Sequence, residues 1–385
     1  MLNDPNNPLS SRASDVRYAI LLGGVLAGTL AESINVKAVI YHRYDDVRVE
    51  DVPIPEIGPD ELLLRPAGCG LCGSDIAKIT GRAMPPVTLG HELAGRIVAI
   101  GATVTTFHVG DRVVVAHHVP CGTCHYCLHG HPSMCAAFKA SNIAPAGFAE
   151  YVRVPAENVR QTTLLLPDHL GDEEASFTEP LACCVRAVRR SALLPGDTAL
   201  VVGLGSIGLQ MVQALKALIE GVRVIGIDRL EDRLALGRAL GVDLALPAET
   251  SALAEQVRAW IDGRGVDVAI LTAGGAQAIQ QALDLLRDGG MLNLFACPPG
   301  LLATFDLSAV YHRELTLTAS YSSSPADLRQ ALELLSAGQV CVAGLVSHRL
   351  PLEQFHEGLE LARTQQALKV FFINRSETPL SASHP

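Results

Sequence analysis

The stretch TALVVGLGSIGLQ, residues 198–210, predicts a strand that runs through a glycine-rich turn directly into a helix. Its apolar start is typical of a buried strand, and Gly203, Gly205 and Gly208 follow in G-x-G-x-x-G spacing. Such glycines permit a tight turn and a close approach of the backbone to a pyrophosphate, while the helix N-terminus supplies amide donors. The stretch therefore predicts the first unit of a dinucleotide-binding fold.

A carboxylate stands where the second strand of this unit is expected to end. The apolar run VRVIGID, residues 222–228, closes on Asp228, twenty residues after Gly208. There it can accept hydrogen bonds from the adenosine ribose and repel a ribose phosphate, which favours NAD over NADP; the adjacent Arg229 keeps NADP open. The alternative is that the three glycines are ordinary turn glycines and that Asp228 is a surface acid. The expected cofactor-binding residues are Gly203, Gly205, Ser206, Ile207, Gly208, Asp228, Arg229 and Arg233.

The pattern around this stretch changes along the chain. Apolar runs alternate with helical patterns from residue 198 to residue 296, which predicts a parallel sheet covered by helices. Before about residue 160, short alternating runs broken by Pro, Gly and Asp predict a β-rich region instead. We therefore expect an α/β chain with these parts: an extension of uncertain order at 1–35, a β-rich domain at 36–184 that is rejoined by about 321–375, and a doubly wound Rossmann domain at 185–320.

Composition limits the classes of function. The chain has 385 residues, of which 49% are hydrophobic, so it can bury a sizeable core. A formal net charge of −10 offers no basic face for nucleic acid. The apolar run at residues 18–31 is too short for a membrane-spanning helix. It is either signal-like or part of a dispensable or disordered extension, and an upstream start-codon misassignment would also explain it. We expect a cytoplasmic protein with neither nucleic-acid nor membrane partners.

A cysteine cluster lies in HVPCGTCHYCLHGHPSMC, residues 118–135. A disulfide scaffold, a nucleic-acid-binding zinc ribbon and a structural metal lobe are the alternatives. Disulfide scaffolds are normally short secreted chains, and thiols this close converge more readily on one tetrahedral cation, so a structural zinc is favoured. Its expected ligands are Cys121, Cys124, Cys127 and Cys135. The histidines around them are expected to be solvated: His117, His118, His125, His129 and His131.

A second set of metal-binding residue types lies upstream, in GLCGSD (70–75) and GHELAG (90–95). It offers a thiolate, an imidazole and a carboxylate, from Cys72, His91 and Glu92. A catalytic zinc takes three protein ligands of these types and keeps one position for water or substrate, whereas a structural zinc is closed by four. The chain therefore offers one open and one closed metal site.

At these motifs the chain resembles the zinc-dependent medium-chain alcohol dehydrogenases, nearest the sorbitol and threonine dehydrogenase branch. The resemblance covers about Val36 to Asn374. It rests on CGSD, on GHE followed by Gly95, Gly101 and Val104, on the four-cysteine lobe, on EPLA (179–182) and on VVGLGSIG.

The resemblance implies roles for individual residues. Cys72 and His91 would bind the catalytic zinc, Glu92 would be an inner-sphere or exchanging ligand, and Glu179 would take the position of a third ligand. The alternative for Glu179 is that it caps a helix begun by Pro180.

Ser74 resembles the family hydroxyl that hydrogen-bonds the substrate alcohol and passes its proton outward. Its alternative is a turn or cap residue. Three residues later, where many relatives carry a relay histidine, this chain has Ala77, so the relay is not assigned beyond Ser74. The other cysteines are expected to be small apolar core residues: Cys69, Cys183, Cys184, Cys297 and Cys341.

The implied protein is a GroES-like catalytic domain joined to a Rossmann domain, with two zinc ions per chain. It would oxidise a secondary alcohol, polyol or amino-alcohol to the ketone by hydride transfer to NAD, as a homo-oligomer, a dimer or tetramer formed through strands of the cofactor domain. The alternatives are a dehydrogenase of the same fold for aldehyde adducts or sugar phosphates, and a catalytically silent binding protein. A basic cluster in the substrate cleft would favour phosphate, and the sequence reveals none.

Overall fold

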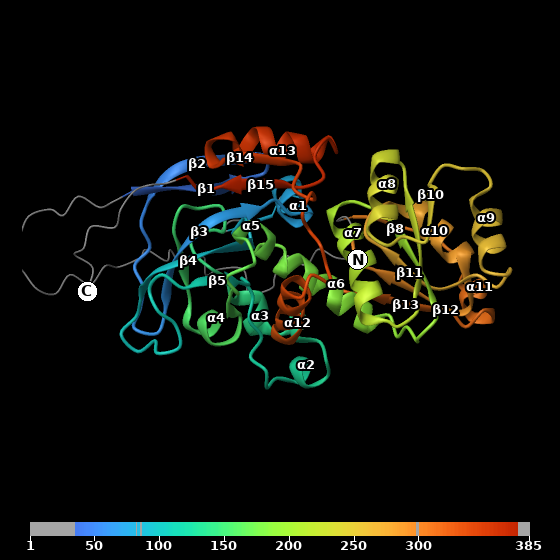
Figure 1. Cartoon of the computed structure of the whole chain (residues 1–385), viewed down its shortest axis with the longest axis horizontal. Coiled ribbons are helices and arrows are strands. Elements are labelled where there is room, and N and C mark those ends of the chain that lie inside the picture. Colours follow the sequence, from blue (N-terminus) through green and yellow to red (C-terminus); the bar gives the residue numbers. More distant parts are fainter. Residues whose placement is uncertain (1–34, 82, 85–86, 298–299, 376–385) are drawn as a thin grey trace, which may run out of the picture. The chain divides into compact units, whose positions relative to one another are not determined.

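The computed structural model describes residues 35–81, 83–84, 87–297 and 300–375. All but the last residue of the expected extension at 1–35 therefore lies outside the described residues. Two sheets organise the described chain, and a hairpin of two antiparallel strands accompanies them (Figure 1). The hairpin consists of β1 (Asn35–Arg43) and β2 (Asp46–Pro53).

A six-stranded parallel sheet contains the glycine-rich stretch. The chain starts it at its centre with β8, extends it to one side, crosses over and extends it to the other, which is the Rossmann strand order. Its strands are apolar almost throughout because helices bury both faces. In spatial order they are β10 (Leu244–Pro247), β9 (Arg223–Asp228), β8 (Thr198–Val202), β11 (Val266–Leu271), β12 (Leu286–Leu294) and β13 (Thr316–Ala319).

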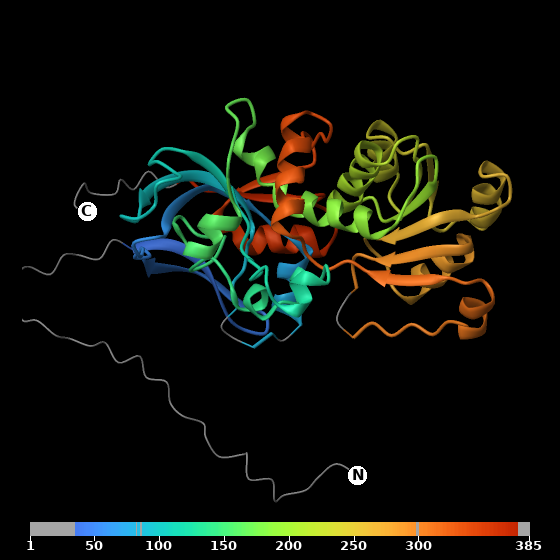
Figure 2. The ribbon, with the colours of Figure 1, turned by 90° about the horizontal axis from the view of Figure 1, so that it is seen from below.

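Helices connect these strands, as Figure 2 shows from below. The sequence SIGLQMVQALKAL, residues 206–218, predicts the helix that follows the glycine turn, and α7 covers this whole range because nothing in it interrupts the helical pattern. The connecting helices are α7 (Ser206–Leu218), α8 (Glu231–Ala239), α9 (Leu253–Trp260), α10 (Ala276–Leu285) and α11 (Leu307–His312).

The other sheet is mixed, and most of its strands come from the β-rich region. The end of the chain returns to it: β15 pairs antiparallel with β3, and β14 pairs parallel with β15. In spatial order the strands are β14 (His348–Pro351), β15 (Val370–Ile373), β3 (Leu62–Gly70), β4 (Glu92–Ile100), β5 (Arg112–Val115) and β7 (Thr163–Leu165), with β6 (Val152–Val154) also paired to β3.

Short helices surround this sheet. They are α1 (Gly73–Thr80), α2 (His125–Leu128), η1 (Pro132–Met134), α3 (Ala136–Ala140), α4 (Ala156–Gln161), α5 (Asp172–Ala175), η2 (Leu352–Gln354) and α13 (Phe355–Arg363).

Two further helices, α6 (Thr178–Arg190) and α12 (Pro325–Ser336), join the two sheets. α6 packs against α7, α12 and β4. One continuous hydrophobic core accordingly includes Val114 of the mixed sheet, Leu181 of α6 and Val201 of the parallel sheet. Burial of this apolar surface fixes α6, and any side chain on its inner face, relative to both sheets.

The fold agrees with the α/β class expected from the sequence, and three local expectations are wrong. The apolar run MLNLFA, residues 291–296, predicts a strand that starts near Met291. β12 instead begins at Leu286, because the turn glycines before Met291 are accommodated by a register shift against β11. Cys297 and Cys341 are exposed rather than in the core, because they lie in loops after β12 and α12. His117 is buried rather than solvated, because it directly follows the buried strand β5.

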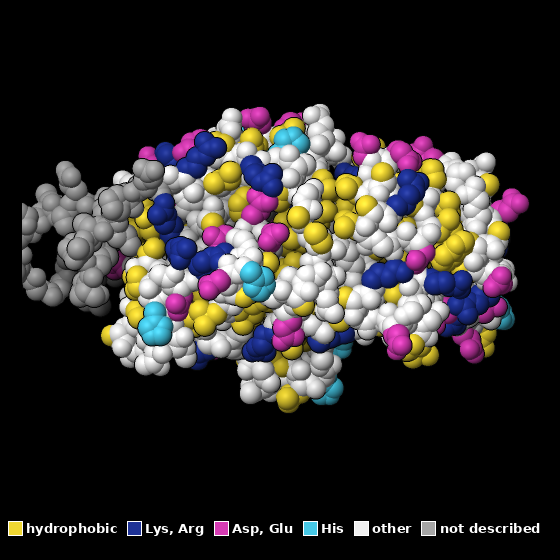
Figure 3. Space-filling view, in the orientation of Figure 1, with side chains coloured by type: hydrophobic (Ala, Val, Ile, Leu, Met, Phe, Trp, Pro, Cys, Tyr) yellow, Lys and Arg dark blue, Asp and Glu magenta, His cyan; other side chains and the backbone are white. Residues whose placement is uncertain are grey.

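Across the described ranges, no helix combines the length and hydropathy that a membrane crossing needs. On the face in Figure 3, basic and acidic side chains are interspersed rather than gathered into one patch. Charge on that face is therefore mixed.

Candidate metal and cofactor site

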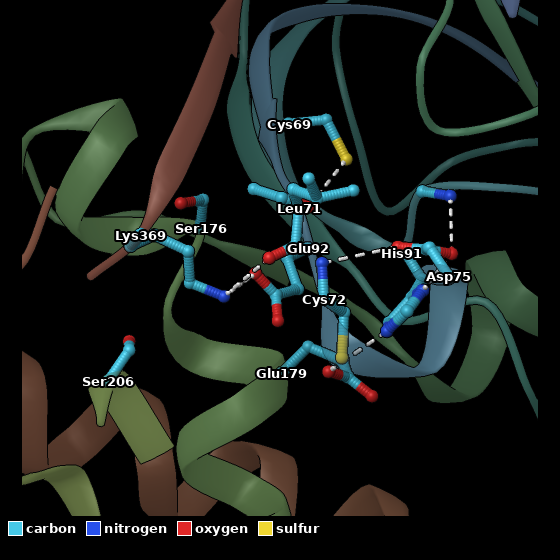
Figure 4. Close-up of polar contacts among 12 residues, drawn as sticks. Cys69, Leu71, Cys72, Asp75, His91, Glu92, Ser176, Glu179, Ser206 and Lys369 are labelled. Carbon is cyan, nitrogen blue, oxygen red and sulfur yellow. Dashed lines mark hydrogen bonds and ion pairs between the residues drawn. The ribbon is translucent and has the colours of Figure 1, made fainter. Parts of the chain in front are cut away.

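Cys72, His91 and Glu92 come together where two strands of the mixed sheet end. Cys72 follows β3 and is the N-cap residue of α1, whereas Glu92 is the first residue of β4 and His91 directly precedes it. Because β3 and β4 pair antiparallel, with Gly70 opposite Glu92, the two motifs meet in space. One thiol sulfur, one imidazole nitrogen and one carboxylate oxygen all lie within 4.8 Å of one another (Figure 4).

Asp75 fixes the orientation of two of these groups. Its side chain is fully buried, one carboxylate oxygen accepts from the Cys72 backbone N–H (3.3 Å) and the other from that of Gly90 (3.0 Å). The second oxygen also lies 3.5 Å from His91 Nδ1. This leaves His91 Nε2 directed toward the other donors, as a ligand imidazole held by a carboxylate would be.

Glu179 reaches the same place from the first turn of α6. Its Oε2 lies 4.0 Å from His91 Nε2, and its side chain is buried. α6 begins at Thr178, with Pro180 within its first turn, and Phe177 is the N-cap residue. Glu179 is therefore inside the helix rather than capping it.

Lys369, which sequence analysis missed, neutralises Glu92. It is 6% exposed, and its ammonium donates to Glu92 Oε2 (2.5 Å) and to the Leu71 carbonyl (3.2 Å). Glu92 Oε1 is buried and has no partner among the described residues. The one signal in the sequence is a lysine beside an otherwise apolar run, LKVFFIN, because a lysine is rarely buried unless it is paired.

The electrostatics of the site favour a cation. Burial lowers the pKa of His91, but the charges of Asp75, Glu179 and Cys72 outweigh burial and raise it well above its ordinary value. Burial also raises the pKa of Glu179. The raised pKa shows that the negative charges around His91 are not balanced by a nearby cation. A divalent ion would supply the positive charge that balances them. The donor set, with a sulfur, a nitrogen and carboxylate oxygens, fits zinc.

Ser74, which the resemblance implies for the proton relay, and Ala77, which stands where many relatives carry a histidine, both lie on α1, which starts next to Cys72. Ser74 is exposed at its first turn, and Ala77 is partly buried one turn later. The structure thus places the Ser74 hydroxyl on the helix that Cys72 caps.

The four cysteines of the lobe converge on one point. Their sulfurs lie within 4.8 Å of one another, and none of the four forms a disulfide. Backbone N–H groups are directed at two of the sulfurs: Cys124 N at Cys121 Sγ (3.3 Å) and Cys121 N at Cys135 Sγ (3.4 Å). Hydrogen bonds from the Thr123 and Cys124 backbone lower the pKa of Cys121 to about 6. Hydrogen bonds therefore stabilise the thiolate of Cys121, whereas burial raises the pKa of Cys127 to about 12. The convergence of four sulfurs fits a closed zinc site, in which the ion would hold all four as thiolates.

The glycine turn between β8 and α7 has the geometry that its spacing predicts. Gly203 has a φ of +91°, in the left-handed region that favours glycine. A Cβ on Gly208 would lie 1.8 Å from the Gly203 carbonyl oxygen, whereas one on Gly205 would meet nothing closer than Arg233 at 3.9 Å. Gly208 is thus required for packing, and Gly205 leaves the space that a pyrophosphate needs.

Asp228 ends β9 beside this turn and is buried. One of its oxygens accepts from the Leu204 backbone N–H (2.7 Å) and the other from that of Leu230 (3.0 Å). Arg233 lies 3.8 Å from the same carboxylate, while Arg229 is exposed and donates to Gln365 (3.0 Å). The carboxylate therefore fixes the turn through both of its oxygens.

The cofactor turn and the metal donors are linked through α6. α6 carries Glu179 at one end and packs on α7, which starts with Ser206 and Ile207. The Cys184 thiol on α6 lies 3.8 Å from the Ile207 carbonyl. Figure 4 shows Ser206 in the same view as the metal donors.

Comparison with known proteins identifies what the chain is similar to. The model of the alcohol dehydrogenase GroES-like domain matches residues 58–167, and that of the zinc-binding dehydrogenase domain matches residues 203–337. The D-arabitol-phosphate dehydrogenase of Enterococcus avium is 33% identical over 341 residues, which cover 87% of this chain and 96% of that protein. The sorbitol dehydrogenase of Bacillus subtilis is 32% identical over 85% of this chain and 94% of its own length.

Solved structures match the whole described fold. The galactitol-1-phosphate dehydrogenase of Escherichia coli has a TM-score of 0.77 and 30% identity, and covers 88% of this chain and 99% of its own. A zinc-binding dehydrogenase from Sinorhizobium meliloti, solved with NADP, has a TM-score of 0.80 and 30% identity, with the same coverage of 88% and 99%.

Proposed function

The chain belongs to the zinc-binding alcohol dehydrogenase family with a GroES-like domain and is an alcohol or polyol dehydrogenase, and from this premise we propose how its residues carry out the reaction. Cys72, His91 and Glu179 hold the catalytic zinc, with Glu92 as an inner-sphere or exchanging ligand. With both groups bound, a secondary alcohol, polyol or amino-alcohol would be oxidised to the ketone by hydride transfer to NAD. The observation that carries this proposal is the convergence of the Cys72, His91 and Glu92 donors within 4.8 Å, with Glu179 4.0 Å from His91.

A zinc ion bound there acts as a Lewis acid that lowers the pKa of a substrate hydroxyl. The chain's own residues provide the rest. Asp75 holds the His91 ring, Lys369 neutralises one oxygen of Glu92, and Ser74 hydrogen-bonds the substrate hydroxyl and accepts its proton. Because position 77 is Ala77 rather than a histidine, Ser74 would release its own proton to water, the cofactor ribose or a different side chain as it takes the proton of the substrate.

Membership of the zinc-binding dehydrogenase family supports the binding of zinc and of a nicotinamide cofactor. We propose in addition which nicotinamide cofactor is preferred and where a second zinc binds. NAD is preferred to NADP, because the Asp228 carboxylate lies at the ribose end of the glycine turn and a ribose phosphate would meet its charge. A second zinc binds Cys121, Cys124, Cys127 and Cys135 and has a structural role, because four thiolates close its coordination.

The chain assembles, we propose, as a homo-oligomer through β13. This strand is the edge of the parallel sheet, and exposed apolar side chains lie on it and near it. An exposed strand edge readily pairs with a second copy of itself. None of the ten cysteines forms a disulfide, which fits the reducing cytoplasm that we propose as the compartment.

The test combines metal content with turnover. The purified protein should contain two zinc ions per chain and reduce NAD with a polyol substrate faster than it reduces NADP. Cys72→Ala should lose one zinc and about 10³-fold or more in kcat/KM, because removal of the Lewis acid costs several kcal/mol in the transition state.

Two variants control for unrelated effects. Cys121→Ser should also lose one zinc but act mainly on the thermal midpoint, and Cys341→Ser, at an exposed thiol outside both sites, should change neither metal content nor turnover. Full activity of Cys72→Ala would refute the assignment of the catalytic metal.

A further inference from the structure

A series of packed rings connects the cysteine lobe to the candidate metal site. The His117 ring packs on the His91 ring, with centroids 4.6 Å apart, and on the His118 ring, at 3.9 Å. The His118 ring also packs on that of Phe138, at 4.8 Å. Phe138 lies on α3, the helix of the lobe that directly follows Cys135. Three successive ring contacts therefore join a helix of the lobe to one of the residues of the metal site.

The plane of the His91 ring decides whether this residue can bind an ion. The lone pair of Nε2 lies in the ring plane, so it points at an ion only when the plane contains that ion. The Asp75 carboxylate lies 3.5 Å from His91 Nδ1, which is longer than an ordinary hydrogen bond, and it meets only the edge of the ring. A contact at one edge leaves the plane free to turn, whereas a second ring packed against it restrains the plane. His117 therefore supplies a restraint that Asp75 does not.

Hydrogen bonds hold the two middle rings of the series in place. His117 is 8% exposed, and its backbone carbonyl accepts from Nδ2 of Asn158, which is fully buried (3.0 Å). His118 Nδ1 donates to the Ser141 carbonyl (2.6 Å), and the Ser141 hydroxyl accepts from the Val119 backbone N–H (2.8 Å). The two rings cannot turn without losing close packing and hydrogen bonds, so the series is stiff.

The lobe end of the series is anchored as well. Cys135 is the N-cap residue of α3 and one of the four converging cysteines, and Ser141 is the C-cap residue of the same helix. Phe138 lies between them and is 2% exposed. Outside α3, the guanidinium of the buried Arg186 on α6 donates to the Gly130 carbonyl of the lobe (3.2 Å). An ion held by the four cysteines would thus order the helix that carries Phe138.

We propose that the cysteine lobe positions His91 through this series of rings. A metal among the four cysteines would fix the start of α3, and α3 would hold the plane of a ligand in the other metal site. The lobe then contributes to catalysis as well as to stability. His117 is a positioning residue, because it acts through His91. The inference rests on the proposed function, in which His91 binds the catalytic zinc.

Cadmium NMR can follow the two metal sites separately. Cadmium binds the same sulfur and nitrogen ligands as zinc, and its resonance frequency depends strongly on the number of bound sulfurs. The protein loaded with cadmium at both sites should therefore give one signal from the four cysteines and a second, well separated, from the site of Cys72 and His91. Titration with a chelator then measures the cadmium affinity of each site.

Breaking the series should weaken only the catalytic site. In Phe138→Leu the catalytic-site signal should shift, and this site should bind cadmium about 3-fold more weakly, because one aromatic contact contributes about that much. In His117→Leu the loss should be about 10-fold, the lower end of the range for residues that orient a metal ligand. The lobe signal should stay unchanged in both variants. Phe107→Leu, at a buried phenylalanine of the same domain outside the series, should lower the thermal midpoint and change neither signal.

Two outcomes would overturn the inference. The first is a catalytic-site signal and affinity that are the same in both variants as in the wild type. The second is an equal loss of both ions from Phe138→Leu and Phe107→Leu, which would indicate general destabilisation. If Phe138→Leu releases the lobe ion itself, His118→Leu breaks the series without altering the sequence of α3 and carries the same expectations.

A measurement without metal keeps the inference separate from the proposed function. Absence of a cadmium signal from Cys72 and His91 in the wild type would count against the proposed function. Crystal structures of the metal-free wild type and of metal-free His118→Leu then still test the positioning. The His91 ring should turn in the variant, and the same ring orientation in both structures would overturn the inference.

Discussion

The pair of Lys369 and Glu92 links the last strand of the chain to the candidate metal site. Both side chains are buried, and the ammonium bridges Glu92 to the Leu71 carbonyl next to Cys72. Burial lowers the pKa of Lys369, but Glu92 and Cys72 outweigh it and raise the pKa, so the lysine is charged at neutral pH. Its role is to hold Glu92 in place as well as to neutralise it.

Replacing one member of this pair should destabilise the protein more than replacing both members. Lys369→Met leaves Glu92 charged and buried, which costs about 3–5 kcal/mol and should lower the thermal midpoint by several degrees. The double variant Glu92→Gln, Lys369→Met should recover most of that loss, because no unpaired charge remains. Thermal unfolding monitored by circular dichroism measures both, with Lys369→Arg as the control that keeps the charge. A midpoint of Lys369→Met equal to that of the wild type would contradict the pairing.

The sequence could identify the site residues that belong to short motifs. It could not identify the residues that distant parts of the chain bring to the site. Cys72, His91 and Glu92 belong to two short motifs that two adjacent strands bring together. Lys369 arrives only because β15 pairs with β3, almost 300 residues earlier, and no spacing rule anticipates that pairing. The sequence predicts that His117 is solvated, and this prediction is wrong. The burial of His117 depends on how the loop after β5 packs.

At the scale of elements, Glu61 joins the start of β3 to β6. Its Oε2 accepts from the Arg153 Nε (2.6 Å) and from the Gly58 backbone N–H (2.7 Å). The hydrogen bond from Arg153 lowers the pKa of Glu61 below its ordinary 4.5, against the opposing effect of burial. A carboxyl whose pKa is lower in the folded state adds stability above the unfolded pKa, and this contribution is lost as the pH falls through the folded pKa.

The stability difference between the wild type and Glu61→Gln should therefore depend on pH. At pH 7 the variant should be less stable by about 1–3 kcal/mol, the range for a hydrogen bond to a charged group. Below the folded pKa the two proteins should converge, because the carboxyl is then neutral in both states. Thermal midpoints over a pH series measure this, and Glu157→Gln, at an exposed pair with Arg160, should have little effect. A difference that does not change with pH would contradict the argument.

Elements with an unbroken pattern were predictable from the sequence, and elements that depend on pairing were less so. α7 occupies the whole expected range, 206–218, because its apolar spacing is continuous. β12 starts several residues early, since the parallel partner β11 draws the glycine-containing segment into the sheet. The short helices of the cysteine lobe have no periodicity and were not expected individually.

For the whole molecule, the outer edge of the parallel sheet is the proposed interface between copies. Leu317 of β13 is 37% exposed, and more fully exposed apolar side chains flank the strand, among them Leu307, Tyr311 and Tyr321. Such a surface is costly to leave in water, and β13 of a second copy could continue the sheet.

Leu317→Lys should convert the oligomer into a monomer, because a lysine on a strand edge opposes pairing with a like strand. Size-exclusion chromatography with light scattering at micromolar concentration measures the mass. Val109→Lys, at an exposed apolar residue of the other domain, should leave the mass unchanged. A wild-type mass of a single chain would contradict the proposed assembly, and an unchanged mass of Leu317→Lys would contradict the proposed interface.

One continuous core around α6 is what allows a metal site and a cofactor turn from separate sheets to serve one reaction. The most direct test of this account is an anomalous difference map at the zinc edge, collected from crystals of the protein grown with NADH. The account predicts two peaks per chain, one bonded by Cys72 and His91 on the side facing the nicotinamide and one among the four lobe cysteines. A map with no peak at Cys72 and His91, or with the nicotinamide remote from that peak, would contradict it.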